Sequence, residues 1–216
     1  MNMNQSALII RDMQLEDISA VIDIYKRCFS DSVNVALGDR FLRTFFKQAL
    51  EEDFSMAVVL KELSSGQVVA VAMGTLKPGY GLRLLRKHFF LVFSRILYGF
   101  FGSAIVRQKV FQYLYSFIIR IFAKKSPPFL DDVGVPLPSL TNLTHLFVAV
   151  DPDCHGRGYG TKILDYLATY MFEKGASRIV GSVSLNNKPS LKLHEKLGWK
   201  MKQISDDRVI VWLRKP

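Results

Sequence analysis

The sequence predicts a mixed α/β domain with a mostly antiparallel central sheet flanked by helices. Its 216 residues are 49% apolar and 22% charged, a balance that supports a buried core and excludes wholesale disorder. Apolar residues recur at the two-residue period of strands in some segments and at the helical period in others. The length favours a single domain, 1–216, with a large insertion over two separate domains.

Strands are expected where short β-rich runs lie between turn signals, and helices where apolar residues recur three and four positions apart. The predicted strands are 7–12, 56–63, 67–76, 143–150, 178–185, 199–204 and 208–213, and the predicted helices are 14–29, 39–50, 161–173 and 188–197. Ser64-Ser65-Gly66 is a hairpin signal between the second and third strands. The order β-α-α-β-β, insert, β-α-β-α-β-β is that of a mixed sheet covered by helices.

The insert between the third and fourth strands is basic and aromatic. No acidic residue lies between Glu62 and Asp131, while 77–125 holds ten of the 29 Lys and Arg residues. The nineteen other basic residues balance the nineteen acidic ones, so the net charge of +10 belongs to this segment. Helix-forming residues over 82–124 predict two or three helices, and the prolines of 126–138 predict an extended linker. The insert and its linker are therefore placed at 77–140.

The insert has several possible roles. The run 88–106 contains Arg95 as its only full charge and as a helix would be about 28 Å long, enough to span a bilayer. The flanking strands should belong to one sheet, however, and the return segment 110–123 is too short for a second span. A helical pair lying on an anionic membrane surface fits better, and a lid or homodimer face is the alternative. The aromatic residues lie in apolar runs rather than singly among Lys and Arg residues, so no nucleic-acid partner is expected.

A glycine-rich turn follows the fourth strand, which ends at Val150. The turn reads His155-Gly156-Arg157-Gly158-Tyr159-Gly160, and a helix begins directly after it. Glycines let a phosphate approach the backbone N–H groups, the helix N-terminus adds partial positive charge, and Arg157 would add a guanidinium fork. The pattern is neither G-x-G-x-x-G nor a Walker A loop. A tight turn that only needs positive φ is the alternative to an anion site.

Two motifs give the chain a family resemblance. The stretch 148–160, Val-Ala-Val-Asp-Pro-Asp-Cys-His-Gly-Arg-Gly-Tyr-Gly, resembles the fourth strand and pyrophosphate loop of the GNAT family of acetyl-CoA-dependent N-acyltransferases, V-x-P-x-x-[RQ]-G-x-G-x-[GA]. The stretch 187–199, Asn-Lys-Pro-Ser-Leu-Lys-Leu-His-Glu-Lys-Leu-Gly-Trp, is similar to the family's second motif, N-x-x-[AS]-x-x-L-Y-x-K-x-G-[FW]. The motifs cover 141–216 and the element order covers 1–76, whereas the insert is not part of the pattern.

The resemblance implies acetyl-CoA as cosubstrate and assigns its contacts. The fourth strand would bind the pantetheine arm and polarise the thioester carbonyl, the loop would hold the pyrophosphate, and an Asn side chain would contact the cofactor arm. The implied cofactor-binding residues are Val148, Ala149, Val150, His155, Gly156, Arg157, Gly158, Tyr159, Gly160, Thr161 and Asn187. Asn186 is adjacent and could take this role instead, and for both residues a turn or a helix cap is the alternative. No metal is expected.

The candidate catalytic residues depart from the family pattern. His194 stands where the family often has a Tyr that protonates the departing thiolate; a protonated imidazole could serve as that acid, or His194 only packs beside Trp199. No Glu stands at the usual base positions of the fourth and fifth strands. His145 is the titratable candidate there, and a structural role for it, with water or a distant residue as the base, is the alternative.

The sequence thus predicts an N-acetyltransferase that transfers an acetyl group to a primary amine by direct attack on the thioester. The acceptor is a small molecule such as an amino sugar; the alternatives are a protein N-terminus, or a catalytically silent membrane-tethered or binding module. Two cysteines, Cys28 and Cys154, make no disulfide framework, and the first residues lack a signal-peptide pattern. These features predict a cytoplasmic protein, with the insert at the inner face of the membrane.

Overall fold

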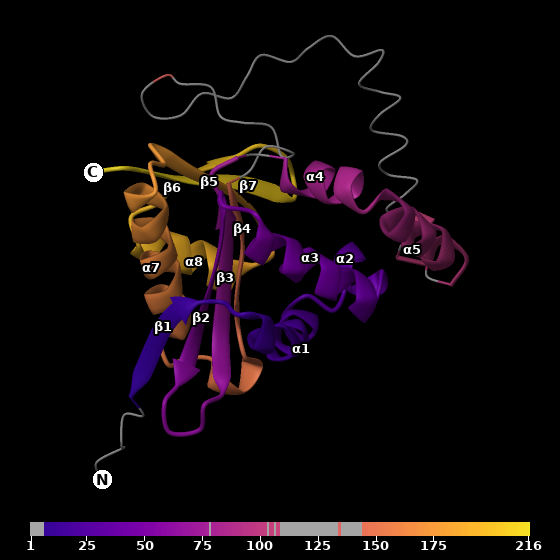
Figure 1. Cartoon of the computed structure of the whole chain (residues 1–216). Helices are drawn as coiled ribbons and strands as arrows, with labels where there is room; N and C mark the ends of the chain where they lie inside the picture. The colour runs from indigo at the N-terminus through magenta and orange to yellow at the C-terminus, as the bar shows by residue number, and fades with distance from the viewer. Residues whose placement is uncertain (1–6, 78, 103, 106, 109–133, 135–143) are drawn as a thin grey trace.

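The computed structural model describes residues 7–77, 79–102, 104–105, 107–108, 134 and 144–216. Figure 1 shows a sheet at the centre of the molecule with helices on both sides. The elements are β1 (Leu8–Asp12), η1 (Leu15–Asp17), α1 (Ile18–Cys28), α2 (Val33–Ala36), α3 (Asp39–Glu51), β2 (Ser55–Glu62), β3 (Val68–Thr75), α4 (Tyr80–Lys87), α5 (Phe89–Gly102), β4 (His145–Val150), η3 (Pro152–Cys154), α7 (Tyr159–Glu173), β5 (Arg178–Ser184), α8 (Lys188–Lys196), β6 (Lys200–Gln203) and β7 (Arg208–Arg214).

The strands form two antiparallel sheets that meet at one point. The first has the order β1-β2-β3-β4 and the second has the order β5-β7-β6. They are joined where the Thr144 N–H donates to the Val180 carbonyl at 3.0 Å and the Val180 N–H donates to the Thr144 hydroxyl at 2.9 Å. The predicted mixed α/β fold with mostly antiparallel pairing is confirmed. The division into two sheets was not predicted, because strand periodicity does not reveal which neighbours pair.

Helices cover the two faces of the first sheet. On one face, α1 and α3 bury residues such as Val21, Leu42 and Phe46 against β2, β3 and β4. On the other face, α7 buries Ile163 and Leu167 against the same strands. Every residue of β3 is buried, because this strand lies inside the sheet and is covered on both faces. The core therefore holds β3 and β4 rigidly between two helical layers.

The predicted helices are present, with small differences at their ends. The segment 14–29 is divided into η1 and α1, and α2 was not predicted because its four residues are too few for a periodic signal. The Ser32 hydroxyl caps α2 by accepting from the Val35 N–H at 3.3 Å. Helix α7 begins at Tyr159, two residues before its predicted start, because Gly158 in the left-handed conformation already caps it.

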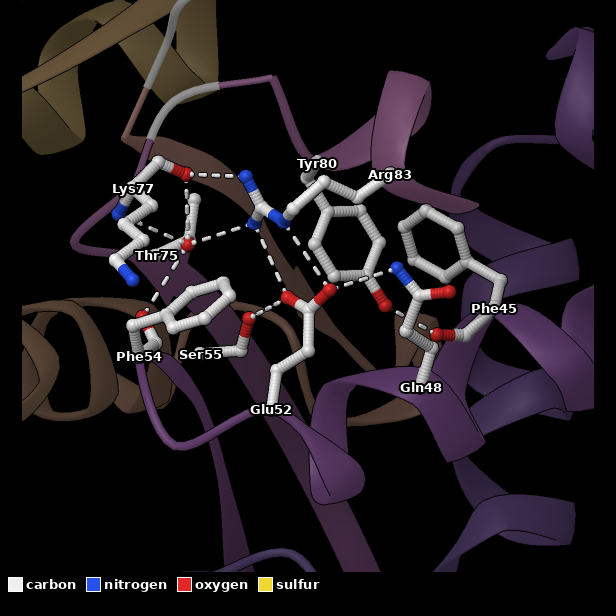
Figure 2. Close-up of polar contacts among 9 residues, drawn as sticks. All are labelled: Phe45, Gln48, Glu52, Phe54, Ser55, Thr75, Lys77, Tyr80 and Arg83. Atoms are coloured by element: carbon white, nitrogen blue, oxygen red, sulfur yellow. Dashed lines mark hydrogen bonds and ion pairs between the residues drawn. The ribbon is translucent and has the colours of Figure 1, made fainter. Parts of the chain in front are cut away.

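The insert contains two described helices, α4 and α5, and the first is fixed to the core by an ion pair. The Arg83 guanidinium meets the Glu52 carboxylate through two contacts of 3.1 Å and donates to the Lys77 carbonyl at 2.9 Å (Figure 2). Glu52 also accepts from Gln48 at 2.9 Å and from Ser55 at 2.8 Å. Apart from 104–105, 107–108 and 134, the rest of the insert and linker lies outside the described residues, so the bounds 77–140 stay a prediction.

Aromatic contacts complete the attachment of α4. The Tyr80 hydroxyl donates to the Phe45 carbonyl of α3, and the two rings pack edge to face (Figure 2). Burial raises the pKa of Tyr80, so the phenol stays protonated and can donate. The Arg83 guanidinium lies 4.6 Å from the Phe54 ring centroid, and Lys87 pairs with Glu51 at 2.6 Å. Two basic residues of the insert are thus paired with acidic residues at the end of α3.

Replacing Arg83 with Met should destabilise the fold by about 2 kcal/mol, because the partly buried Glu52 carboxylate would lose its charged partner. Arg86→Met is the matched control: it changes an exposed Arg of the same helix and should stay within about 0.5 kcal/mol of the parent. Urea unfolding followed by circular dichroism gives both free energies. Equal values for the two variants would contradict a stabilising role of the ion pair.

Candidate active site

A cavity of about 960 Å³ opens where β4 and β5 diverge. Its walls come from β4, the loop that follows it, β5 and α8, with the end of α1 at one side. The described lining residues include Arg27, Lys192, Lys196 and Arg208 but no Asp or Glu. A second cavity, around Thr75 and Ser177, is only about 200 Å³. The larger one has the size of a cofactor site and an electropositive wall.

The open edge of β4 forms one wall of this cavity. Asp151 donates its N–H to Val69 of β3, so alternate residues of β4 face β3, while Val148 and Val150 present their backbone groups to the open edge. The Val150 carbonyl accepts from the Cys28 thiol at 3.1 Å and from the His155 imidazole at 3.0 Å. Val148 therefore offers the edge N–H and C=O that face the middle of the cavity.

The glycine-rich loop has the geometry of an anion site. Gly156 and Gly158 both have φ of +78°, a conformation that glycine adopts without strain. Gly158 caps α7, so the N–H groups of the first helical residues have no intrahelical acceptor and carry the positive end of the helix dipole. A Cβ on Gly160 would lie 3.5 Å from side-chain atoms of Val150 and Leu193, so the helix start packs closely on β4 and α8.

Near the glycine-rich loop, the arginine that lines the cavity is Arg27, whereas the sequence predicts Arg157. The Arg157 guanidinium lies 3.8 Å from Glu62 of β2 and does not line the cavity. Arg27, which the sequence analysis missed, does line it and pairs with Asp151 and Asp153 at 2.8 Å each. These pairs hold the start of the loop against α1. No sequence motif marks Arg27, because its partners lie more than 120 residues away.

Asn187 lines the cavity and also caps a helix. Its side-chain oxygen accepts from the Ser190 N–H at 3.1 Å at the start of α8. The helix-cap interpretation is therefore confirmed, and the contact with a cofactor stays a prediction. Four further lining residues were not predicted, because they lie on four separate elements, α1, β5, α8 and β7, and become neighbours only in the fold: Cys28, Ser182, Lys192 and Arg208.

Two histidines meet in the fork between β4 and β5. The ring centroids of His145 and His194 are 5.5 Å apart, and the Trp199 ring packs edge to face on His194 at 4.9 Å. The Nδ1 of His194 lies 2.7 Å from the Ser190 carbonyl, which can only accept, so Nδ1 carries the proton and Nε2 of the neutral ring does not. The Nε2 atoms of both histidines are buried without a hydrogen-bond partner. Orphaned polar atoms of this kind, at a cavity wall, indicate a site for a polar ligand.

Burial keeps both imidazoles neutral. It lowers the pKa of His145 to about 3, with a further decrease from the neighbouring His194. Burial also lowers the pKa of His194, and the hydrogen bond to the Ser190 carbonyl partly opposes this. Gly181 makes room for the first ring: a Cβ at this position would lie 2.8 Å from Nδ1 of His145. A glycine in β5 thus allows the histidine of β4 to enter the fork.

Comparison with known proteins agrees with this geometry. A model of the acetyltransferase (GNAT) family matches residues 134–199, which include the glycine loop and both histidines. Residues 134–199 therefore resemble part of a GNAT acetyltransferase domain. A search of curated protein sequences found no match.

Solved GNAT structures share the fold over nearly the whole chain. An N-acetyltransferase from Staphylococcus aureus Mu50 is 16% identical with a TM-score of 0.58, and the match covers 97% of this chain and 99% of that one. A ribosomal-protein-S18-alanine N-acetyltransferase from Escherichia coli is 15% identical (TM-score 0.54), covering 96% and 94%. A putative acetyltransferase from Salmonella typhimurium, solved with acetyl-CoA, is 17% identical (TM-score 0.53), also covering 96% and 94%.

The GNAT comparisons support an acyltransferase that takes its acetyl group from acetyl-CoA. Within the part of the chain that the structure describes, no helix has the length and apolar character needed to cross a membrane. The predicted residue roles, the acceptor, the cytoplasmic location, the membrane surface and the homodimer stay predictions.

The depressed pKa of His145 should make folding stability depend on pH. Between about pH 6.5, its ordinary pKa, and pH 3 the unfolded chain binds a proton at this residue that the folded chain does not. The free energy of unfolding should therefore fall by up to about 1.4 kcal/mol per pH unit as the pH drops through this window. His145→Gln should remove the contribution of this residue to the pH dependence. Urea unfolding of parent and variant at several pH values measures the free energy of unfolding of each. Parallel pH curves would contradict the assignment.

Proposed function

We propose that this protein transfers the acetyl group of acetyl-CoA to a primary amine by direct attack on the thioester. The observation that carries the proposal is the junction of three features in one cavity: the open edge of β4, the glycine loop at the start of α7, and the two buried histidines. Acetyl-CoA supplies an activated acyl group when it is bound. The chain's own residues bind it, orient it and move the protons.

Backbone groups carry most of the cofactor binding in this proposal. The N–H groups at 156–161 hold the pyrophosphate, because they lie in the left-handed glycine turn and at the positive end of α7. Val148 binds the pantetheine arm through its edge N–H and C=O, and Asn187 supports the arm with the amide group that its cap leaves available. Lys192 and Lys196 add positive charge to the cavity wall, whereas the charge of Arg27 is already paired with Asp151 and Asp153.

His194 is proposed to move the proton in two steps. The neutral ring offers the bare Nε2 atom, which can accept a proton from the attacking amine but cannot first donate one. Once protonated, the buried imidazolium is a stronger acid than an ordinary histidine, because burial lowers its pKa. A thiol has an ordinary pKa of about 8.5, so transfer of this proton from Nε2 to the departing sulfur is downhill. The acid predicted from the sequence thus acts only after it has served as the base.

His145 is proposed to position rather than to titrate. With a pKa of about 3 its imidazole is a poor base at neutral pH. Its ring fills the fork beside Gly181 and lies 5.5 Å from the His194 ring. We therefore assign the proton transfer to His194 and an orienting contact to His145.

The proposed acceptor is a small amine that carries neutral or negative groups, such as an amino sugar derivative. A cationic peptide acceptor would be expected to need carboxylates near the reacting amine, and the described lining of the cavity contains basic residues but no Asp or Glu. The protein N-terminus stays the alternative: a GNAT structure of similar fold is a ribosomal-protein-alanine N-acetyltransferase. That likeness, at 15% identity, shows the fold alone.

Replacing Gly158 with Ala should weaken acetyl-CoA binding by at least about tenfold, because a side chain at φ of +78° distorts the loop that presents the N–H groups. Gly175→Ala is the matched control. Gly175 has φ of +99° at the other end of α7, away from the cavity, so it should lose stability but keep its affinity. Isothermal titration with acetyl-CoA compares the two, and no affinity in the folded parent would exclude the proposal.

His194→Ala should lower turnover by about 10²-fold or more with little change in acetyl-CoA affinity, because the proton transfer is needed only during reaction. His194→Tyr should recover only part of this loss, because its hydroxyl can donate to the departing sulfur but does not offer the nitrogen that first accepts the proton of the amine. Release of CoA thiol is followed with a panel of amines that pairs amino sugars with their phosphate esters and includes peptides with free N-termini.

Two results would contradict this assignment. Parent-like turnover of His194→Ala across the neutral pH range would leave His194 with only its packing against Trp199. No thiol release by the parent with any amine, despite acetyl-CoA binding, would support the catalytically silent module instead.

A further inference from the structure

The helix α5 carries apolar side chains on two faces, only one of which is packed on the protein. Ile96 packs against the core that α3 shares with α1. Other side chains are exposed, with 85% of Phe90 and 75% of Tyr98 and of Phe101 open to solvent. We call the exposed residues Phe90, Phe93, Leu97, Tyr98 and Phe101 the α5 stripe. Phe90, Phe93, Leu97 and Phe101 follow one another at spacings of three and four, and Tyr98 stands three positions before Phe101, so all five lie on one side of the helix.

The α5 stripe differs from the other exposed apolar residues of the described chain. Elsewhere such residues, for example Leu15, Leu63 and Tyr166, lie singly on separate elements, as is normal for soluble proteins. Here six lie on a single helix, the five of the α5 stripe and Phe89, and Figure 1 shows this helix at the edge of the molecule beside α3 and α4. A contiguous apolar surface of this kind is a mark of an interaction site.

Basic groups lie at both ends of the α5 stripe. Exposed Arg86 and Lys87 precede the helix, and the Arg107 guanidinium donates to the Phe100 and Phe101 carbonyls at 3.4 and 3.3 Å at its other end. The sequence holds no acidic residue between Glu62 and Asp131, so the insert itself contributes no negative charge to this surface. Glu51 of α3 pairs with Lys87 and offsets only that one cation.

We propose that the α5 stripe docks on an anionic lipid membrane, with its rings in the interfacial layer and the flanking bases on the headgroups. Such a surface offers apolar depth and negative charge together, which this combination of rings and cations requires. A second copy of the chain would bring identical basic groups together across a symmetric contact, and the repulsion would oppose pairing. A nucleic acid would neutralise the Arg and Lys side chains but would leave the aromatic rings of the α5 stripe exposed to water.

The attachment of α4 to the core makes this docking specific in orientation. Tyr80 fixes α4 on α3, Arg83 fixes it on Glu52 just after α3 and on Thr75 of β3, and α5 follows after His88. The α5 stripe is therefore held on the folded domain rather than on a free tether. Lipid binding would place the whole enzyme in a defined pose on the membrane.

Vesicle sedimentation of the full chain tests the proposal without any need for acetyl transfer. The protein should bind phosphatidylglycerol-containing vesicles, bind pure phosphatidylcholine vesicles far less, and bind more weakly as salt screens the bases. The triple variant Phe90→Ser, Tyr98→Ser, Phe101→Ser should bind at least about tenfold less, because the buried rings carry the apolar share of the affinity. Leu15→Ser, Leu63→Ser, Tyr166→Ser is the matched control and should bind like the parent.

A second pair of variants separates the charge contribution. Arg86→Gln with Arg107→Gln should weaken anionic binding and reduce its salt dependence, whereas Lys188→Gln with Lys200→Gln, on α8 and β6, should not. Thermal unfolding by circular dichroism shows whether each variant is folded. The proposal is overturned if the folded parent ignores anionic vesicles at low salt, or if the triple variant binds them as the parent does. It is also overturned if the stripe substitutions only convert a parent dimer into a monomer.

Discussion

The contact between Thr144 and Val180 is the constraint on which the site depends. It joins the two sheets by backbone and hydroxyl hydrogen bonds at the start of β4 and within β5. Beyond it the strands pair with β3 and β7 instead of with each other. The edge of β4 is therefore left open over a cavity, and backbone N–H and C=O groups that a continuous sheet would consume remain available to a ligand.

The same divergence creates the histidine fork. Gly181 lies next to the junction, and its missing side chain leaves the space that the His145 ring occupies. Burial in this fork makes both imidazoles neutral and leaves one nitrogen of each without a partner. A Tyr at position 194 would offer a hydroxyl donor, whereas the imidazole of His194 offers an acceptor. Replacing one by the other therefore changes the order of proton transfers rather than only the identity of the acid.

The insert joins the core in two chemically different ways. Its first helix uses a charged network, in which Glu52 satisfies Arg83, Gln48 and Ser55 at once (Figure 2). Its second helix uses apolar packing through Ile96 and leaves a row of rings outside. The polar network fixes the orientation of α4 on the core, and α5 provides an exposed apolar surface. Composition alone assigns the whole excess positive charge to the insert. In the structure, carboxylates of the core neutralise two of these charges, at Arg83 and Lys87.

Local sequence determined the elements and the cofactor loop. Hydrophobic periodicity fixed the strands and long helices, and the glycines at 156, 158 and 160 indicated a phosphate-binding helix start because backbone conformation and helix dipole act over only a few residues. The motif around 187–199 likewise needed no tertiary information. These features lie within short windows, where spacing alone predicts which groups face the same way.

Only the tertiary structure decided which distant residues share the cavity and in what protonation state. Arg27 reaches Asp151 across 124 positions, Arg157 turns to Glu62, and the Arg83–Glu52 pair spans 31 positions. The pKa values of His145 and His194 follow from burial in a fork whose walls come from β4, β5 and α8. Periodicity cannot reveal such facts, because desolvation and ion pairing depend on distances through space and not on separation along the chain.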